Sequence, residues 1–323
     1  MATYKGIQGF AIQNVTSDPT TVGQVWYNSS NTVFKFYTGV TGSASWASGG
    51  NLGSARYALG GAGTQTAGLG FGGYSNALSP AITAITEEYN GSSWTAGGAL
   101  GTARNYLEGC GTQTAALGIG GIGASPPSRV LTEEYGGTSW TNGGAMSNSR
   151  YAFAAAGTQT AALAISGNPG PTSATEEYDG SSWTNGGAVT TARRGSAGAG
   201  TQTAGLLFGG NAPGGNSNAT EEYDGSSWTN GGTLNTARFY LGGAGTQTSA
   251  IGFGADPASA ATELYDGSSW TNTSNLNTVR KNPGEAGATG PAALAFGGLA
   301  PSKTAATEEF TGAILATKTI TTS

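Results

Sequence analysis

Two kinds of side chain that suit sugar recognition recur at fixed intervals along this chain of 323 residues. Six Trp are separated by 48, 46, 43, 45 and 42 residues, and an Arg follows each of them ten residues later. An Arg guanidinium binds carboxylates, and a Trp ring offers a large apolar face. A ring of such residues could therefore bind an acidic sugar. The residues are Trp46, Trp94, Trp140, Trp183, Trp228 and Trp270, with Arg56, Arg104, Arg150, Arg193, Arg238 and Arg280.

The same residues have a structural interpretation, which we favour. Eleven of the 13 Glu fall in a recurring Glu-Glu-Tyr segment, such as Glu87-Glu88-Tyr89, and six of the eight Arg fall in the register above. We expect each Arg to pair with a Glu or with loop carbonyls, and each Trp to pack between repeat units. A sialidase-like enzyme would need an Asp acid and a Tyr–Glu pair in one pocket. The units are too alike for one of them to hold a specialised catalytic set.

The composition excludes several function classes. The chain has no His and one Cys, so we expect no His-dependent triad, no disulfide within the chain and no metal site. Its 13 Lys and Arg residues are scattered and the net charge is −5, which argues against a nucleic-acid partner. No apolar run is long enough for a membrane span, and we identify no signal peptide. We predict no catalytic residue, no metal and no cofactor.

The elements that must position these residues are short strands. In the first unit, apolar runs cover residues 57–62, 67–73 and 86–89, and a fourth run carries the Trp. An Asn-Gly or Asp-Gly pair between the third and fourth runs suits a tight turn. Four short antiparallel strands in a repeat of about 45 residues are typical of one blade of a β-propeller.

The repeat resembles the kelch repeat over residues 33–315. The resemblance rests on the order Arg, apolar-Gly-Gly, Tyr and Trp. The third copy departs from it with Ser166-Gly167, the fifth with Gly254-Ala255, and the last has Phe310 for Tyr and Leu315 where Trp is expected. The resemblance implies a β-propeller and says little about function, because this fold hosts many activities. A copper enzyme of the galactose-oxidase kind would need His ligands, which are absent.

We therefore predict an all-β fold, a six-bladed kelch-like β-propeller with four antiparallel strands per blade. The last unit lacks its Trp, and the segment around Trp46 supplies a spare fourth strand. We expect the N- and C-terminal strands to meet in one blade and close the ring; a seventh, partial blade is the alternative. The predicted domains are an arm or hairpin over residues 1–32 and the propeller over residues 33–323.

The loops of a four-stranded blade divide between two ends. One end carries the repeated Gly-Thr-Gln-Thr turns and the Asp-Gly-Ser-Ser turns, and the other carries loops of variable length at 74–85, 122–131, 168–174, 211–219, 256–261 and 299–306. Because recognition tends to sit on loops held by a rigid scaffold, we place any binding site on the variable loops. The alternative is that these loops are insertions without a partner. The candidates are Tyr74, Asn76, Arg129, Asn168, Asn211, Asn216, Asp256 and Lys303.

Two other features have simpler interpretations. The repeated Gln65, Gln113, Gln159, Gln202 and Gln247 could display amides to a ligand, but we favour hairpin turns stabilised by Thr and Gln side chains. Cys110 replaces a small residue of a first strand, and we interpret it as core packing.

The segment 23–37 lies before the repeats and predicts two strands around an Asn-Ser-Ser-Asn turn. It resembles a hairpin of bacteriophage tail-associated proteins, and the repeats with Gly-Thr-Gln-Thr resemble those of marine phage proteins. The resemblance implies a virion component, present in many copies on the particle surface. We expect residues 1–22 to dock on another virion protein.

Three function classes follow. The first is a phage structural and adhesion protein, such as part of a tail fibre, that binds a host-surface glycan or protein through the variable loops. The second is a decoration or scaffold module without a ligand. The third is a glycan-active enzyme, which the presence of a single Asp in the variable loops, Asp256, weighs against.

Overall fold

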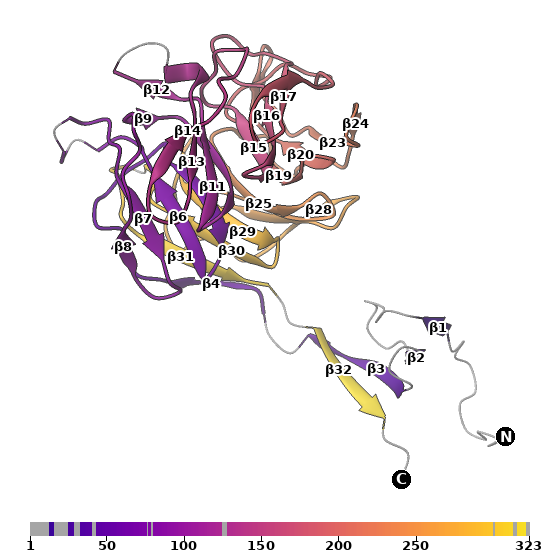
Figure 1. Cartoon of the computed structure of the whole chain (residues 1–323). Helices are drawn as coiled ribbons and strands as arrows, with labels where there is room; N and C mark the ends of the chain where they lie inside the picture. Colours follow the sequence, from indigo (N-terminus) through magenta and orange to yellow (C-terminus); the bar gives the residue numbers. More distant parts are fainter. Residues whose placement is uncertain are drawn as a thin grey trace, which may run out of the picture. The chain divides into compact units, whose positions relative to one another are not determined.

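The computed structural model describes residues 43–75, 77–78, 80–124, 128–299 and 301–312, and the backbone of strands at 13–15, 25–28, 33–40 and 315–320 (Figure 1). The chain divides into two compact units, one formed by Met1–Ala44 and Gly312–Ser323 and the other by Ser45–Thr311. Among the described residues, no helix is long and apolar enough to cross a membrane.

The unit Ser45–Thr311 is a β-propeller of six four-stranded antiparallel sheets, as predicted. Blade 1 comprises β5 (Gly60–Thr64), β6 (Ala67–Phe71), β7 (Thr86–Tyr89) and β8 (Trp94–Ala96). Blade 2 comprises β10 (Glu108–Thr112), β11 (Ala115–Ile119), β13 (Thr132–Tyr135) and β14 (Trp140–Asn142). Blade 3 comprises β15 (Ala154–Thr158), β16 (Ala161–Ile165), β17 (Thr175–Tyr178) and β18 (Trp183–Asn185).

The remaining blades repeat this plan. Blade 4 comprises β19 (Ala197–Thr201), β20 (Ala204–Phe208), β23 (Thr220–Tyr223) and β24 (Trp228–Asn230). Blade 5 comprises β25 (Gly242–Thr246), β26 (Ser249–Phe253), β27 (Thr262–Tyr265) and β28 (Trp270–Asn272). Blade 6 comprises β29 (Gly284–Thr289), β30 (Ala292–Phe296), β31 (Thr307–Thr311) and β4 (Ser45–Ser48). Short pieces outside the blades are β9 (Arg104–Asn105), β12 (Ile122–Gly123), β21 (Asn211–Ala212), β22 (Gly215–Asn216) and the 3₁₀ turn η1 (Ser128–Val130).

The ring closes in blade 6. There β31, from the end of the propeller, pairs antiparallel with β4, from its beginning, and Phe310 lies opposite Trp46. The predicted closure by terminal strands is confirmed, and the alternative of a seventh, partial blade is wrong. Closure removes the open sheet edges that a linear array would expose.

The first strand of each blade begins later than the sequence predicts. In blade 1 the expected run 57–62 is replaced by β5 at Gly60–Thr64. The reason is Ala58, whose φ of 52° lies in the left-handed region and cannot continue a strand.

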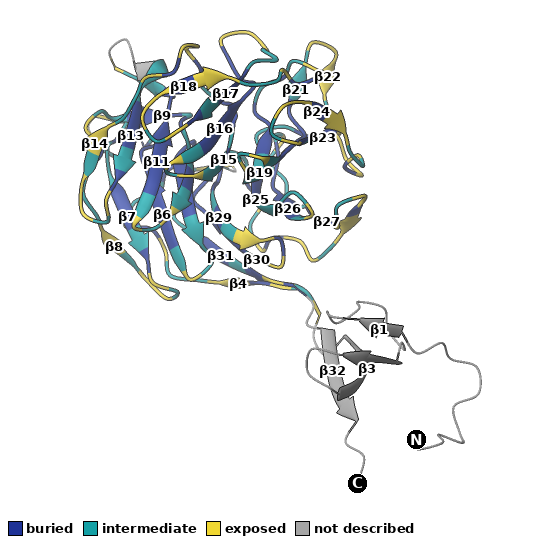
Figure 2. Cartoon of the chain, turned by 45° about the vertical axis from the view of Figure 1, so that its right-hand side comes forward, coloured by how far each residue is buried: buried dark blue, intermediate teal, exposed yellow. Residues whose placement is uncertain are grey.

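The first strands of neighbouring blades pack side by side at the centre of the ring, and Figure 2 shows burial on the inner strands and exposure on the outermost ones. The close approach requires very small residues. At Gly61, a Cβ would collide with the backbone of Glu285 in the neighbouring first strand. Gly and Ala therefore dominate these strands despite the weak strand propensity of Gly.

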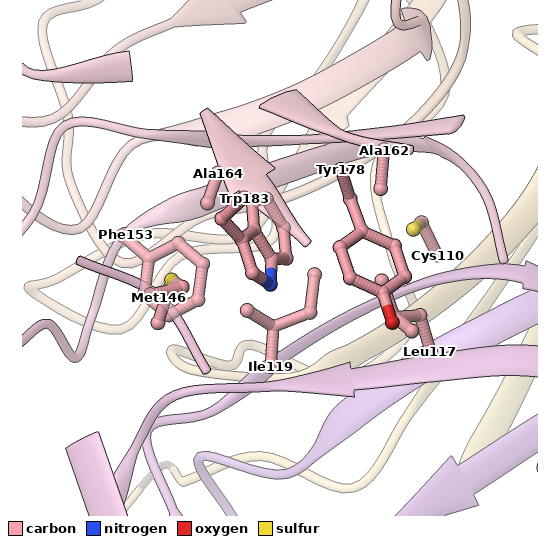
Figure 3. Packing of buried hydrophobic residues seen from close by; sticks show 9 residues of the cluster. All are labelled: Cys110, Leu117, Ile119, Met146, Phe153, Ala162, Ala164, Tyr178 and Trp183. Carbon is pink, nitrogen blue, oxygen red and sulfur yellow. The ribbon is translucent and has the colours of Figure 1, made fainter. Parts of the chain in front are cut away.

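The core lies between the blades. One cluster joins blades 2 and 3, where Trp183 and Phe153 of blade 3 pack on Ile119 of blade 2, and Cys110 and Tyr178 belong to the same cluster (Figure 3). The interpretation of Cys110 as core packing is confirmed.

The other unit contains a four-stranded sheet in the order β1 (Gln13–Val15), β2 (Val25–Asn28), β3 (Val33–Val40) and β32 (Leu315–Ile320). The expected hairpin is present, because β2 and β3 pair antiparallel with Asn28 opposite Val33. The predicted domain boundary after residue 32 differs from this division, because β3 pairs with β2 and β32 and belongs to no blade. Most of the expected docking arm, 1–22, lies outside the described residues.

Candidate functional site

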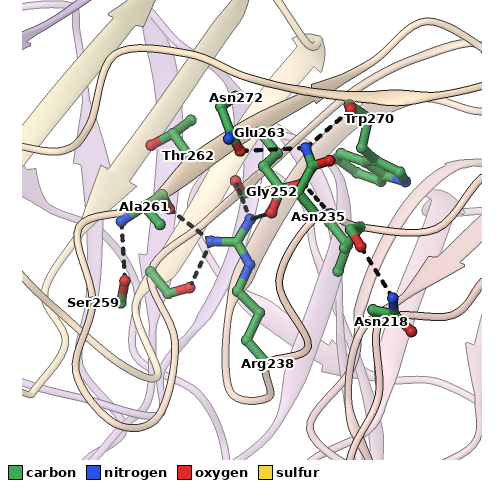
Figure 4. A network of polar contacts seen from close by, with 12 residues as sticks. Asn218, Asn235, Arg238, Gly252, Ser259, Ala261, Thr262, Glu263, Trp270 and Asn272 are labelled. Atoms are coloured by element: carbon green, nitrogen blue, oxygen red, sulfur yellow. Dashed lines mark hydrogen bonds and ion pairs between the residues drawn. The ribbon is translucent and has the colours of Figure 1, made fainter.

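A buried Arg–Glu ion pair holds each blade together. The side-chain N–O distances are 2.5 Å for Arg56–Glu87, 2.9 Å for Arg104–Glu133 and Arg150–Glu176, and 2.8 Å for Arg193–Glu221 and Arg238–Glu263; Arg280 pairs with Glu308. Arg238 also donates to the carbonyls of Gly252 and Ala261, at 3.4 and 2.7 Å (Figure 4). Burial lowers the pKa of each Arg, and the carboxylate opposes that shift. These six Arg are buried, so they form no open ring for an acidic sugar.

The Trp register fastens each blade to the blade before it. Trp183 Nε1 donates to Thr132 Oγ1 at 2.9 Å, and the same Trp–Thr bond occurs at all six junctions. The ring also packs on an apolar side chain of the preceding blade, as Trp140 does on Phe71 with centroids 4.8 Å apart. The predicted packing of the Trp between blades is confirmed, and these rings are not platforms for sugar.

The Tyr register forms a second junction at five of the six interfaces. Tyr178 Oη donates to Glu134 Oε1 of blade 2 at 2.6 Å, and burial together with this bond raises the pKa of Tyr178 to about 12. The equivalent pairs are Tyr89–Glu309, Tyr135–Glu88, Tyr223–Glu177 and Tyr265–Glu222.

At the sixth interface, between blades 5 and 6, both the Tyr and the Glu of this pair are replaced. Blade 6 has Phe310 in place of Tyr, and the corresponding position of blade 5 is Leu264 in place of Glu. The exchange is consistent, because Phe has no hydroxyl to donate and Leu needs no donor. Loss of the pair therefore leaves no carboxylate without its Tyr.

The repeated Gln side chains also join blades. Gln113 Nε2 donates to the carbonyls of Gly68 and Tyr89 in blade 1, at 3.0 and 2.6 Å. The Thr next to it closes the hairpin, because Thr112 Oγ1 accepts from the N–H of Ala115. The expected role of Thr is confirmed. The Gln amides neither stabilise their own turn nor face a ligand, because they are used between blades.

A closed circle of backbone hydrogen bonds surrounds the centre at the end opposite these turns. We call the six Arg of the buried Arg–Glu pairs the framework Arg. The second residue after each of them donates its N–H to the carbonyl of the equivalent residue in the preceding blade, at 2.7–3.0 Å. All six residues have φ between 47° and 58°, in the left-handed region. They are Ala58, Tyr106, Ala152, Gly195, Tyr240 and Asn282. The circle satisfies groups at the axis that would otherwise be unpaired, which offsets the strain.

Behind this circle the central channel is narrow. A cavity of about 30 Å³ is lined by Glu108, Glu285 and residues of the circle, and a second of about 90 Å³ is lined by Gly and Ala of the first strands together with Cys110 and Glu285. The smaller holds about two waters. Burial raises the pKa of Glu285 to about 8, and burial with the neighbouring Glu285 raises the pKa of Glu108.

The mouth face is our name for the end of the propeller formed by the circle, the connections between blades and the variable loops. Aromatic side chains cover its centre, and Tyr106 lies among them with ring centroids 6.3 Å from Tyr57, 6.4 Å from Tyr151 and 5.8 Å from Tyr240. Tyr74 extends the row, 5.5 Å from Tyr57. These five Tyr are half-buried, so part of each ring remains accessible.

Four cations lie among these rings. Arg129 Cζ stands 4.9 Å from the centroid of Tyr151, and Lys303 Nζ stands 5.3 Å from that of Tyr74. Lys281 Nζ binds Asp256 at 2.9 Å. Burial raises the pKa of Tyr240, and the nearby charge of Arg194 offsets part of that rise. Such an assembly can stack on a ring and bind an anion at the same place.

The opposite end, which we call the turn face, carries the Gly-Thr-Gln-Thr and Asp-Gly-Ser-Ser turns. Asp179 accepts from the N–H groups of Ser181 and Ser182, at 2.8 and 2.7 Å, and these bonds lower its pKa to about 2. Asp224 and Asp266 repeat the arrangement. Over the described residues of the propeller, this face has acidic side chains and no Lys or Arg.

The predicted binding residues fall into three groups. Tyr74, Arg129, Asp256 and Lys303 belong to the Tyr-and-cation cluster. Asn211 and Asn216 bind each other in the exposed β21–β22 hairpin. Asn168 is only 2% exposed and cannot contact a ligand, and Asn76 lies outside the described residues.

Most residues of the cluster were not predicted from the sequence: Tyr57, Tyr106, Tyr151, Arg194, Tyr240 and Lys281. A signal was present, because the two residues after each framework Arg are Tyr-Ala, Asn-Tyr, Tyr-Ala, Arg-Gly, Phe-Tyr and Lys-Asn, whereas their surroundings repeat. Each first residue pairs with a variable loop, as Phe239 does with Asp256. The positions that vary inside the repeat therefore lie at the same end of the propeller as the variable loops, the mouth face.

No protein-family model matches the chain, and no curated protein matches it. The resemblances to kelch repeats and to phage proteins therefore stay predictions. In the part of the chain that the structure describes, no group of three or more acidic or thiol side chains could hold a metal ion.

Proposed function

We propose that this chain is a non-enzymatic bacteriophage virion protein whose propeller attaches the particle to a host surface through the mouth face. The observation that carries the proposal is the convergence of five Tyr and four cations on one end of a framework that is otherwise repeated six times. A packed scaffold with one chemically distinct end is suited to recognition.

The narrow channel supports binding over catalysis. Glu108 and Glu285 are the two acidic side chains outside the framework that come close together; both line the cavity of about 30 Å³, and Glu285 also lines the one of about 90 Å³. A sugar is many times larger than the water molecules that fit there. The carboxyl pair is therefore out of reach of a glycan substrate.

The virion assignment rests on the resemblance of 23–37 and of the repeats to phage proteins. The unit formed by Met1–Ala44 and Gly312–Ser323 is separate from the blades and is free to serve as the attachment to other virion proteins. Deleting residues 1–22 should leave the propeller folded and prevent incorporation into particles. Particles that still carry the truncated chain would contradict this attachment.

Antibody-gold labelling of intact particles from the source lysate tests the location. Label at the tail or at fibre tips is expected for host attachment. Label spread over the shell would favour the alternative, a decoration module without a ligand, and particles without label would overturn the virion assignment.

Cell binding tests the attachment itself. Fluorescently labelled protein should bind cells from the same source, and Tyr106→Ala should reduce that binding. Asp224→Asn on the turn face is the matched control, because it keeps the turn geometry and leaves the mouth face intact. Equal loss in both variants, or no binding by the unaltered protein, would contradict host attachment.

A further inference from the structure

We propose that the ligand of the mouth face is an acidic oligosaccharide, a sugar chain that carries carboxylate or sulfate groups. The inference rests on the proposed function and names the substrate class of that same site. Three properties of the mouth face carry it: a row of accessible rings, cations without a carboxylate partner, and a closed floor.

The row of rings suits an extended chain of sugars. From Tyr74 the rings follow one another through Tyr57 and Tyr106 to Tyr151, with centroid separations of 5.5, 6.3 and 6.4 Å. These steps are similar to the length of one sugar residue. The successive ring planes are inclined by 58°, 87° and 67°, so a sugar chain would meet ring edges as well as faces. A half-buried Tyr offers part of an apolar ring for packing and a hydroxyl for hydrogen bonds, and a pyranose ring can use both contacts.

The cations make the site positively charged. Elsewhere in the described propeller each framework Arg has a Glu partner, and on the mouth face Lys281 has Asp256. Among the described residues, Arg129, Arg194 and Lys303 form no ion pair, and Arg129 and Lys303 rest on Tyr rings. The site therefore keeps positive charge on a protein whose net charge is −5. An anion bound here would gain charge-assisted hydrogen bonds.

The number of charges favours a sugar over a nucleic acid. Three unpaired cations would neutralise few phosphates, and a protein of pI about 4.8 repels a polyanion of high charge density. An oligosaccharide with a charge on some of its residues needs few cations and uses the Tyr rings for the rest of its contact area.

The floor of the site decides how the ligand lies. The backbone circle closes the mouth, and the cavity behind it, of about 30 Å³, has room for about two waters. The sugar chain must therefore lie across the face, over Tyr106, and cannot thread the channel. Residues from several blades then contribute to one binding event, which no single variable loop could provide.

Isothermal titration with defined oligosaccharides tests the proposal on the full chain. The probes are a polyuronate oligomer, a sulfated galactan oligomer, and the same two chains after carboxyl reduction or desulfation. We expect at least one acidic probe to bind about tenfold or more tightly than its neutral form, because one charge-assisted hydrogen bond contributes about that factor. Equal affinity for an acidic probe and its neutral form, or no binding of any probe, would overturn the proposal.

Variants separate charge from stacking. Arg129→Gln with Arg194→Gln should weaken the acidic probe about tenfold and flatten its dependence on salt, without lowering the melting temperature. Tyr106→Ala should weaken acidic and neutral probes alike. Asp224→Asn on the turn face should bind as the unaltered protein does. An unchanged affinity in the double Arg variant would contradict the role of charge.

The cell-binding assay distinguishes the two levels of the hypothesis. If labelled protein binds cells and periodate treatment of the cells abolishes binding, the receptor is a glycan, as proposed. Binding that survives periodate but is lost after protease treatment would mean a protein receptor, so the oligosaccharide fails and host attachment stands. Absence of cell binding would remove the proposed function itself.

Discussion

The two ends of the propeller follow opposite rules. On the turn face blades 1 to 5 repeat nearly the same turns, and Gln113 and its equivalents reach from there into the neighbouring blade. On the mouth face the two residues after the framework Arg differ from blade to blade, except that blades 1 and 3 share Tyr-Ala. The difference indicates that side chains with contacts at blade junctions stay the same from blade to blade, whereas positions outside the junctions vary. Stability should therefore depend on the junctions and recognition on the mouth face.

The largest expected effect is at a junction. Trp183→Ala removes a ring that is 7% exposed, together with its bond to Thr132. We expect a loss of roughly 3–5 kcal/mol in the free energy of unfolding, measured by denaturant titration. Tyr151→Ala on the mouth face is the matched comparison and should cost clearly less. A loss below about 1 kcal/mol for Trp183→Ala would mean that the ring is not buried.

The next effect concerns the ion pair inside a blade. Arg193 and Glu221 have fully buried side chains, and Nη1 and Nε of Arg193 lack hydrogen-bond partners. Glu221→Gln should destabilise the protein by about 3 kcal/mol, because it leaves a buried guanidinium without a counter-charge. Arg129→Gln on the mouth face should change stability by no more than about 0.5 kcal/mol. Similar losses of stability in the two variants would contradict the expectation that stability depends on the ion pairs inside the blades more than on the mouth face.

The channel between the two faces predicts a dependence on pH. Glu285, with its pKa raised to about 8, keeps a proton that the unfolded chain releases near pH 4.5. The folded state binds more protons at this site in this window, so the contribution of Glu285 to stability is greatest below pH 4.5 and falls as the pH rises toward 8. We expect the free energy of unfolding to fall across this window, because the folded site holds the proton of Glu285 more tightly than the unfolded chain does. Glu285→Gln should flatten the curve, and an unchanged slope would contradict this origin.

The smallest effect tests the exchange at the sixth interface. Tyr178→Phe should cost about 1 kcal/mol, because Glu134 loses a donor. Adding Glu134→Leu reproduces the Phe310–Leu264 combination of blades 5 and 6 and should recover part of that loss. A double variant less stable than Tyr178→Phe alone would contradict the expected recovery.

Much of the fold was predictable because its determinants recur. The period, the six units and the closing strand at Trp46 all follow from the spacing of Trp, Arg and Tyr, since repeated residues make repeated contacts. The predicted start of the propeller at residue 33 differs from the observed division, because a strand with apolar residues such as 33–37 fits a blade and the β2–β3–β32 sheet equally well.

The site was less predictable because several of its residues lie outside the variable loops. Loop length drew attention to Tyr74 and Lys303, whereas Tyr106 lies in a short connection next to a first strand. Its left-handed backbone follows from the circle of six hydrogen bonds, which exists only when the ring has closed. A property of the whole ring cannot be found in the pattern of one unit.

The seam of the ring has a consequence for the rate of unfolding. Beyond β4 and β31 the chain continues into β3 and β32, which pair with each other through Val40 and Leu315. If β4 detaches from β31, the second ladder keeps the two segments tethered, so their effective concentration stays high and the seam re-forms within the molecule. Lasting opening of the ring therefore requires the second ladder to separate as well. Persistence of the closed ring is thus a matter of kinetics, set by a pairing outside the blades.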